Sequence, residues 1–222
     1  MTTSQALDRK SQADIAGVRA WISRHLDPLD AAASTTTPFR SDYDLKASPP
    51  PRQGSVTPAA VLIALAERSG GLSVILTRRS DTLRRHTGQI ALPGGRCDPG
   101  EMPWQTALRE AQEEIGLDPA KVSLAGLSTC YRTGTGYHIT PVVGFLAADF
   151  TTAANPAEVA DIFETPFGFL MDPANHEQRE ARESGGNIRH FYAMTWEDRL
   201  IWGATAGILR ALYDRLYGAL VA

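Results

Sequence analysis

The stretch that decides the fold reads Gly95-Arg-Cys-Asp-Pro-Gly-Glu101 and continues, seven residues later, as Arg109-Glu-Ala-Gln-Glu-Glu-Ile-Gly-Leu117. In the seven residues between the two parts and in the second part, apolar residues recur three and four positions apart. This spacing predicts a helix from about Pro103 to Ile115. Proline suits the first helical turn, and Gly116 suits the C-cap. The apolar side of this helix, formed by Trp104, Ala107, Leu108, Ala111 and Ile115, is sufficient to pack on a sheet.

The other side of the predicted helix is acidic. Glu110, Glu113 and Glu114 stand at positions i, i+3 and i+4, so their carboxylates share one face. Like charges at this spacing cost a few tenths of a kcal/mol, roughly, and only Arg109 is placed to pair, with Glu113. Clustered hard oxygen ligands are what Mg²⁺ or Mn²⁺ prefers. For this segment alone, a solvated acidic helix face is the commoner explanation, because short motifs often match by chance.

The complete spacing is far more specific than the acidic face. It is similar, at every fixed position, to the Nudix box, with the matching residues Gly95, Glu101, Arg109, Glu110, Ala111, Glu113, Glu114, Gly116 and Leu117. The resemblance implies a mixed α+β fold, the α/β/α sandwich of the Nudix family with a mixed β-sheet. In that family the box forms a loop, a helix and a second loop.

The resemblance also implies a set of site residues. Glu110, Glu113 and Glu114 correspond to metal ligands, and Gly95 to the source of a backbone carbonyl ligand. Arg109 resembles the residue that orients the glutamates. Mg²⁺ or Mn²⁺ would neutralise the charge of a diphosphate and help to generate the attacking hydroxide.

Two further parts of the site are the supporting acid and the general base. Glu101 resembles the supporting acid of the box, in a structural role. The general base is not identified by the sequence: Glu110 and acids outside the box, such as Glu158 and Glu164, are all candidates. The number of metal ions is open as well.

A second resemblance narrows the substrate. Segments before and after the box are similar to those of coenzyme A pyrophosphatases, with Leu92 where phenylalanine is usual; they are Leu76–Ser80, Leu83–Gly95, Tyr131–Thr133, Tyr137–Pro141 and Trp202–Ala206. This likeness covers about residues 58–218. It implies hydrolysis of CoA or acyl-CoA to 3′,5′-ADP and 4′-phosphopantetheine or its acylated form.

Arginines before the box are the predicted substrate-binding residues. Arg78, Arg84 and Arg85 belong to a cluster of arginines within one short stretch. Arginine binds phosphate groups in a planar, bidentate manner, so we expect these three to contact the anionic substrate rather than to form surface salt bridges. Two alternatives remain: a Nudix hydrolase with another substrate, such as ADP-ribose or a nucleoside triphosphate, and a non-catalytic Nudix-fold ligand sensor.

The rest of the chain predicts two regions. Residues 1–56 are expected to hold an amphipathic helix over 12–26 and an extended arm, rich in Pro, Ser and Thr, over 33–58. Residues 1–50 are expected to carry no catalytic group. Residues 57–222 form the predicted hydrolase domain, with strands at Ala59–Ala66, Leu72–Thr77, Val122–Thr129, Thr140–Leu146 and, more weakly, Ile188–Met194, and a final helix over Trp202–Tyr217 capped by Gly218.

Composition bounds the remaining possibilities. The 222 residues carry a net charge of −3, which disfavours a general nucleic-acid binder. The longest apolar runs are too short to span a bilayer, and two cysteines make no disulfide framework. The chain is therefore expected in the cytoplasm, with a small-molecule partner and no membrane. Whether it forms a homodimer is left open.

Overall fold

The computed structural model describes residues 15–31, 39–45, 56–81, 88–182, 186 and 188–221. Its helices are α2 (Ile15–Arg24), α3 (Pro103–Ile115), α4 (Phe167–Leu170) and α5 (Ala204–Val221), with 3-10 turns η1 (Asp42–Leu45), η2 (Pro119–Lys121) and η3 (Pro173–Asn175). Its strands are β1 (Phe39–Ser41), β2 (Thr57–Arg68), β3 (Gly71–Arg79), β4 (Ile90–Ala91), β5 (Gly94–Arg96), β6 (Val122–Leu127), β7 (Cys130–Arg132), β8 (Tyr137–Leu146), β9 (Val159–Pro166), β10 (Glu177–Arg182), β11 (Ile188–Trp196) and β12 (Arg199–Trp202).

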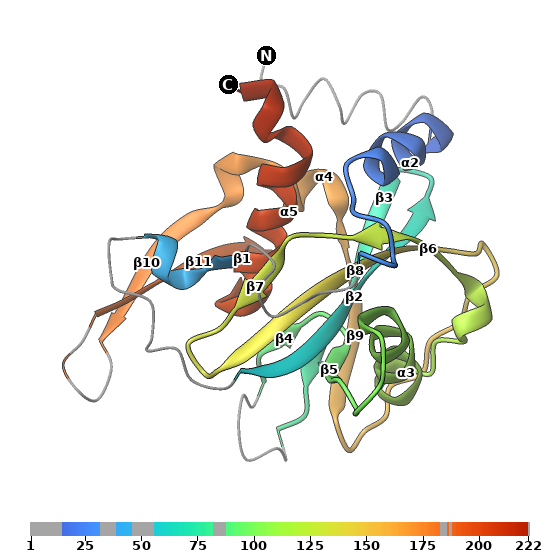
Figure 1. Ribbon diagram of the computed structural model, residues 1–222, viewed down its shortest axis with the longest axis horizontal. Coiled ribbons are helices and arrows are strands. Elements are labelled where there is room, and N and C mark those ends of the chain that lie inside the picture. The colour runs from blue at the N-terminus through green and yellow to red at the C-terminus, as the bar shows by residue number, and fades with distance from the viewer. Residues whose placement is uncertain are drawn as a thin grey trace.

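The strands form a large mixed sheet and a small antiparallel one (Figure 1). In the large sheet the order is β1-β7-β8-β2-β3-β4, while β5 pairs with β2, β6 with β8 and β9 with β3. The pairs β1–β7 and β2–β8 are parallel and the others are antiparallel. The predicted mixed α+β class is therefore confirmed. The small sheet, β10-β11-β12, leads into α5.

Strands β2 and β3 are joined at one end and separate at the other. They pair only where Leu65–Arg68 meets Gly71–Val74. Beyond that point β5 pairs with β2 at Ala59–Val61, and β4 pairs with β3 at Thr77–Arg78. The short strands β4 and β5 therefore lie where β2 and β3 separate. They bring the segment that precedes the box into the sheet.

The sheet is covered on both faces, which makes the sandwich. On one face α3 buries Ala107, Ala111 and Ile115 against a cluster that includes Ala60 and Leu62 of β2. The residues of β2 that alternate with these, Ile63 and Leu65, belong to a second cluster built with α5 and α2. Side chains of a strand point alternately to its two faces, so one strand supports both layers.

The structure departs from the predicted elements in several places, and the short strands β1, β7, β10 and β12 were not predicted. Strand β9 was not predicted, because Val159–Pro166 lacks a regular apolar alternation and is only partly buried. The final helix begins at Ala204 rather than Trp202, since β12 runs to Trp202 and Gly203 turns the chain with φ +63°. Gly218 lies within α5 instead of capping it.

The described N-terminal residues pack against the domain that follows. Ile22 of α2 is fully buried in the same core as α5, and Arg215 of α5 forms an ion pair with Asp27 at 2.6 Å. Within the predicted arm, Phe39–Ser41 forms strand β1 beside β7 (Figure 1). The division of the chain near residue 56 stays a prediction. No helix among the described residues is long and apolar enough to cross a membrane.

Candidate active site

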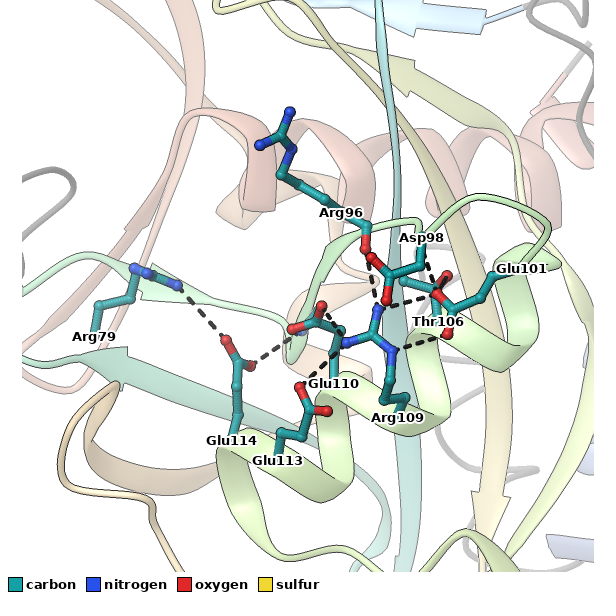
Figure 2. Close-up of polar contacts among 10 residues, drawn as sticks. Arg79, Arg96, Asp98, Glu101, Thr106, Arg109, Glu110, Glu113 and Glu114 are labelled. Atoms are coloured by element: carbon teal, nitrogen blue, oxygen red, sulfur yellow. Dashed lines mark hydrogen bonds and ion pairs between the residues drawn. The ribbon is translucent and has the colours of Figure 1, made fainter.

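Arg109 of α3 joins most of the acidic groups of the box (Figure 2). Its guanidinium donates to Glu101 at 2.9 and 3.0 Å, to Glu110 at 2.8 Å and to Glu113 at 3.2 Å. It also donates to the carbonyl oxygen of Arg96 at 3.1 Å. One cation therefore holds the loop and two glutamates of the helix in place, and it offsets the repulsion among the carboxylates.

Glu101 ties the loop to the start of the helix. Besides Arg109, its carboxylate accepts hydrogen bonds from the Thr106 hydroxyl at 2.7 Å and the Asp98 backbone N–H at 3.0 Å. The bonds from Arg109, and then those from Thr106 and Asp98, lower the pKa of Glu101 to about 2. This residue is a permanently charged anchor of the loop at neutral pH.

The three glutamates of the helix differ in their surroundings. Glu114 is buried, with 3% of its surface exposed, whereas 55% of the Glu113 side chain is exposed. Glu114 accepts a hydrogen bond from the Gly94 N–H at 3.1 Å and lies 3.6 Å from the Arg79 guanidinium. Burial nevertheless raises the pKa of Glu114 to about 7, and burial also raises the pKa of Glu110.

Two glycines let the β5 backbone approach these carboxylates. A Cβ on Gly95 would lie 2.5 Å from the carboxyl carbon of Glu110. Gly94 has a φ of +156°, and a Cβ there would lie 2.3 Å from the carbonyl oxygen of Ala60. A side chain at either position would therefore have to displace the β2 backbone or a glutamate of the box.

A cavity of about 750 Å³ lies beside β5. Its lining comes from segments distant in the sequence: Tyr43, Val61, Arg79, Gln89–Leu92, Gly94, Thr133–Thr135, Ile139, Ile188–His190, Trp202–Thr205 and Ile208. None of the three box glutamates lines it directly. Gly94 and Arg79 do, and both contact Glu114, so the cavity adjoins the box at the point where β2 and β3 part.

The NUDIX domain model matches residues 56–190. The chain belongs to the Nudix family. Over 159 residues it is 39% identical to the uncharacterized Nudix hydrolase NudL of Yersinia pestis (strain Pestoides F), which covers 71% of this chain and 79% of that protein. NudL of Yersinia pseudotuberculosis (strain IP 31758) matches to the same extent.

Solved Nudix structures resemble the chain over about half its length. The Ap4A hydrolase of C. elegans in a binary complex is 19% identical, with a TM-score of 0.44, and covers 49% of this chain and 80% of that one. RenU of M. smegmatis is 27% identical, with a TM-score of 0.43, and covers 52% and 73%. Both TM-scores lie below 0.5, so neither structure informs the substrate. The family assignment makes this chain a Nudix diphosphatase that acts on a nucleoside diphosphate derivative.

Nudix hydrolases generally use a divalent cation such as Mg²⁺ or Mn²⁺, and the donors of this Nudix site suit one. Glu110 and Glu114 are carboxylates whose charged form is disfavoured by burial, which a nearby cation would offset. Among the described residues, however, no three His, Cys, Asp or Glu side chains already form a metal cage. Arg109 engages Glu110 and Glu113, so these carboxylates would have to turn towards a metal.

The arginines predicted to bind substrate lie in different surroundings. Arg78 lies at the surface and pairs with Asp81 at 3.1 Å, and it is not part of the cavity lining. Arg84 and Arg85 lie outside the described residues. The sequence reasoning missed Arg79, the next residue along β3, whose side chain reaches Glu114 and the cavity. Strand alternation places Arg78 and Arg79 on opposite faces of the sheet, but only the packing of α3 decides which face meets the box.

The two candidates for the general base outside the Nudix box, Glu158 and Glu164, lie in different surroundings. Glu164 on β9 forms an ion pair with Arg68 at 2.5 Å. The negative charge of Glu158, in contrast, adds to the effect of burial in raising the pKa of both Glu110 and Glu114. Glu158, Glu164 and Glu110 all stay candidates for the general base.

Proposed function

We propose that this Nudix hydrolase cleaves the diphosphate of CoA or acyl-CoA, releasing 3′,5′-ADP and 4′-phosphopantetheine or its acylated form. One observation carries the proposal. The segments that resemble coenzyme A pyrophosphatases, which are far apart in the sequence, contribute Arg79, Gln89–Leu92, Thr133, Ile139 and Trp202–Thr205 to the lining of a single cavity. A shared lining is what a common substrate would require of them.

In this proposal Glu110, Glu113, Glu114 and the Gly95 carbonyl would hold Mg²⁺ or Mn²⁺, which supplies charge neutralisation and an activated water when bound. Arg109 orients Glu110 and Glu113 through its hydrogen bonds. Arg79 presents a cation at the boundary between cavity and box, where the diphosphate would lie. Glu110, Glu158 or Glu164 would take the proton from the attacking water.

The decisive experiment is product analysis by mass spectrometry after incubation of the enzyme with CoA and Mg²⁺. We expect 3′,5′-ADP and 4′-phosphopantetheine to accumulate, and expect none when Mg²⁺ is replaced by a chelator. A panel of CoA, acetyl-CoA, ADP-ribose and a nucleoside triphosphate fixes the specificity. Much higher kcat/KM for ADP-ribose or the triphosphate would refute the CoA assignment and leave the family assignment intact.

The sensor alternative is tested by the same assay. A non-catalytic ligand sensor would bind a nucleotide without turnover, and loss of a box glutamate would signal it. All box glutamates are present in this chain. Tight CoA binding by calorimetry, with no product at any Mg²⁺ or Mn²⁺ concentration, would favour the sensor over the enzyme.

A further inference from the structure

The N-terminal arm reaches the cavity through one residue, Tyr43. Tyr43 belongs to η1, outside residues 56–190 that match the NUDIX domain model, yet it lines the same cavity as Arg79 and Gly94. No feature of the box or of the segments around it points to this residue. Its place depends on how the arm is attached.

The arm is fixed on the domain by strand pairing and charge. Residues Phe39–Ser41 pair in parallel with Cys130–Arg132 of β7 (Figure 1). Arg40 forms an ion pair with Asp214 of α5 at 2.7 Å. The Ser41 N–H donates to the Asp44 carboxylate at 3.0 Å, which shapes the turn that presents Tyr43.

The hydroxyl of Tyr43 lies against the turn at Gly134, where no side chain blocks its approach. Its oxygen is 2.9 Å from the position that a Cβ on Gly134 would take. No described residue hydrogen-bonds this hydroxyl. The flanking Thr133 and Thr135 hydroxyls bond to each other at 3.0 Å. This part of the lining therefore offers hydroxyls, an aromatic ring and backbone peptide groups.

Arg79, a cation of the lining, belongs to another part of the cavity. Arg79 is on β3, and β8 and β2 stand between β7 and β3 in the sheet order, so at least three strand spacings of roughly 5 Å separate the two places. The Arg189 guanidinium lies 3.7 Å from the Cβ position of Gly203. Arg189 is on β11, a strand that contacts η1 as well as β12, so Arg189 is not separated from Tyr43 in the way that Arg79 is.

We infer that the Tyr43 side of the cavity binds the pantetheine part of the substrate, with Tyr43 as a substrate-binding residue, while the Arg79 side takes the phosphorylated nucleotide. The inference rests on the proposed CoA activity. Pantetheine is an uncharged chain with two amides and aliphatic segments, which matches hydroxyls, peptide groups and the apolar Ile139 nearby. The 3′-phosphate of the nucleotide needs cations instead.

The test uses the full-length chain and three variants, Tyr43→Phe, Tyr43→Ala and Leu45→Ala. Leu45 lies in the same 3-10 turn but not in the cavity lining, so it controls for disturbance of the arm. KM and kcat are measured with CoA. Binding of 4′-phosphopantetheine and of 3′,5′-ADP is measured separately by calorimetry.

For Tyr43→Phe we expect KM for CoA to rise about 3- to 10-fold with kcat nearly unchanged, because one hydrogen bond is lost. Tyr43→Ala should raise it further. Both should weaken 4′-phosphopantetheine binding and leave 3′,5′-ADP binding within about twofold, and Leu45→Ala should change neither. Unchanged kinetics in Tyr43→Phe, or weaker 3′,5′-ADP binding instead, would overturn the inference. A wild-type enzyme that does not cleave CoA would overturn the proposed function instead.

Discussion

At the scale of single residues, Glu114 is the box glutamate most dependent on its surroundings. It is buried and held by the Gly94 N–H and Arg79. Glu114→Gln keeps the shape and an oxygen acceptor for Gly94 but removes the charge. We expect kcat at saturating Mg²⁺ to fall by at least about 10²-fold, with an unchanged circular dichroism spectrum, because one preorganised charge is lost.

The control for Glu114→Gln is Gln112→Ala on the exposed side of the same helix, which should keep full turnover. Near wild-type turnover in Glu114→Gln would remove Glu114 from the mechanism.

Arg78 and Arg79 provide a matched pair one residue apart. Arg79 reaches Glu114 and the cavity, whereas Arg78 pairs with Asp81 at the surface. Arg79→Ala should lower kcat/KM for CoA about 10- to 100-fold, the cost of a lost charge-assisted contact of about 1.5–3 kcal/mol. Arg78→Ala should change it less than about threefold, as expected for an exposed ion pair. Steady-state kinetics of both variants decide, and equal effects would contradict the assigned geometry.

At the scale of elements, substitutions at the two neighbouring glycines of strand β5 should have different effects, one on stability and one on activity. In Gly94→Ala the new Cβ would meet the β2 backbone, so we expect a loss of unfolding free energy of about 1–3 kcal/mol or more. In Gly95→Ala it would meet the end of the Glu110 side chain, which can move. Gly95→Ala should therefore stay folded and lose activity. Thermal unfolding and kcat measured on both variants test the contrast, and an active Gly95→Ala would count against a role of the Glu110 position in turnover.

The loop that begins the box should contribute a pH-dependent term to stability. The pKa of Glu101 is lowered to about 2 from its ordinary value of 4.5. A carboxylate with a lowered pKa stabilises the folded state above its unfolded pKa, and the contribution is lost as the pH falls from about 4.5 towards 2. Glu101→Gln should be less stable than wild type at pH 7, and the difference should shrink over this range. Urea unfolding at several pH values measures it; a difference independent of pH would contradict the role of Arg109 as the partner.

At the scale of the whole molecule, the N-terminal residues should matter for stability and binding more than for chemistry. A chain starting near Arg52 loses the buried Ile22 and Leu26, the Asp27–Arg215 ion pair and Tyr43. We expect a loss of several kcal/mol, on the order of two buried apolar side chains, and a higher KM for CoA. The catalytic groups stay, so measurable kcat should remain. A folded, metal-binding truncation without any turnover would contradict this.

Local sequence patterns were sufficient to predict the helix of the box, because the residues that determine this helix lie within a few helical turns. The 3.6-residue period, the proline at the first turn and Gly116 at the end predicted α3 with its observed bounds, and Gly116 has the left-handed φ of 62°. The contact of Arg109 with Glu113 followed from i,i+4 spacing in the same way. The family was predicted from the resemblance that this segment carries, and the mixed fold class is what that resemblance implies.

Only the tertiary structure decided which charged side chains of the sheet and of α3 come into contact. The choice of Arg79 over Arg78 depends on which face of β3 points to Glu114, and the place of Tyr43 depends on the pairing of β1 with β7. The burial that raises the pKa of Glu114 arises where β2 and β3 part around β4 and β5. These relations join residues tens of positions apart, and packing of the two layers creates them, so spacing along the chain carries no record of them.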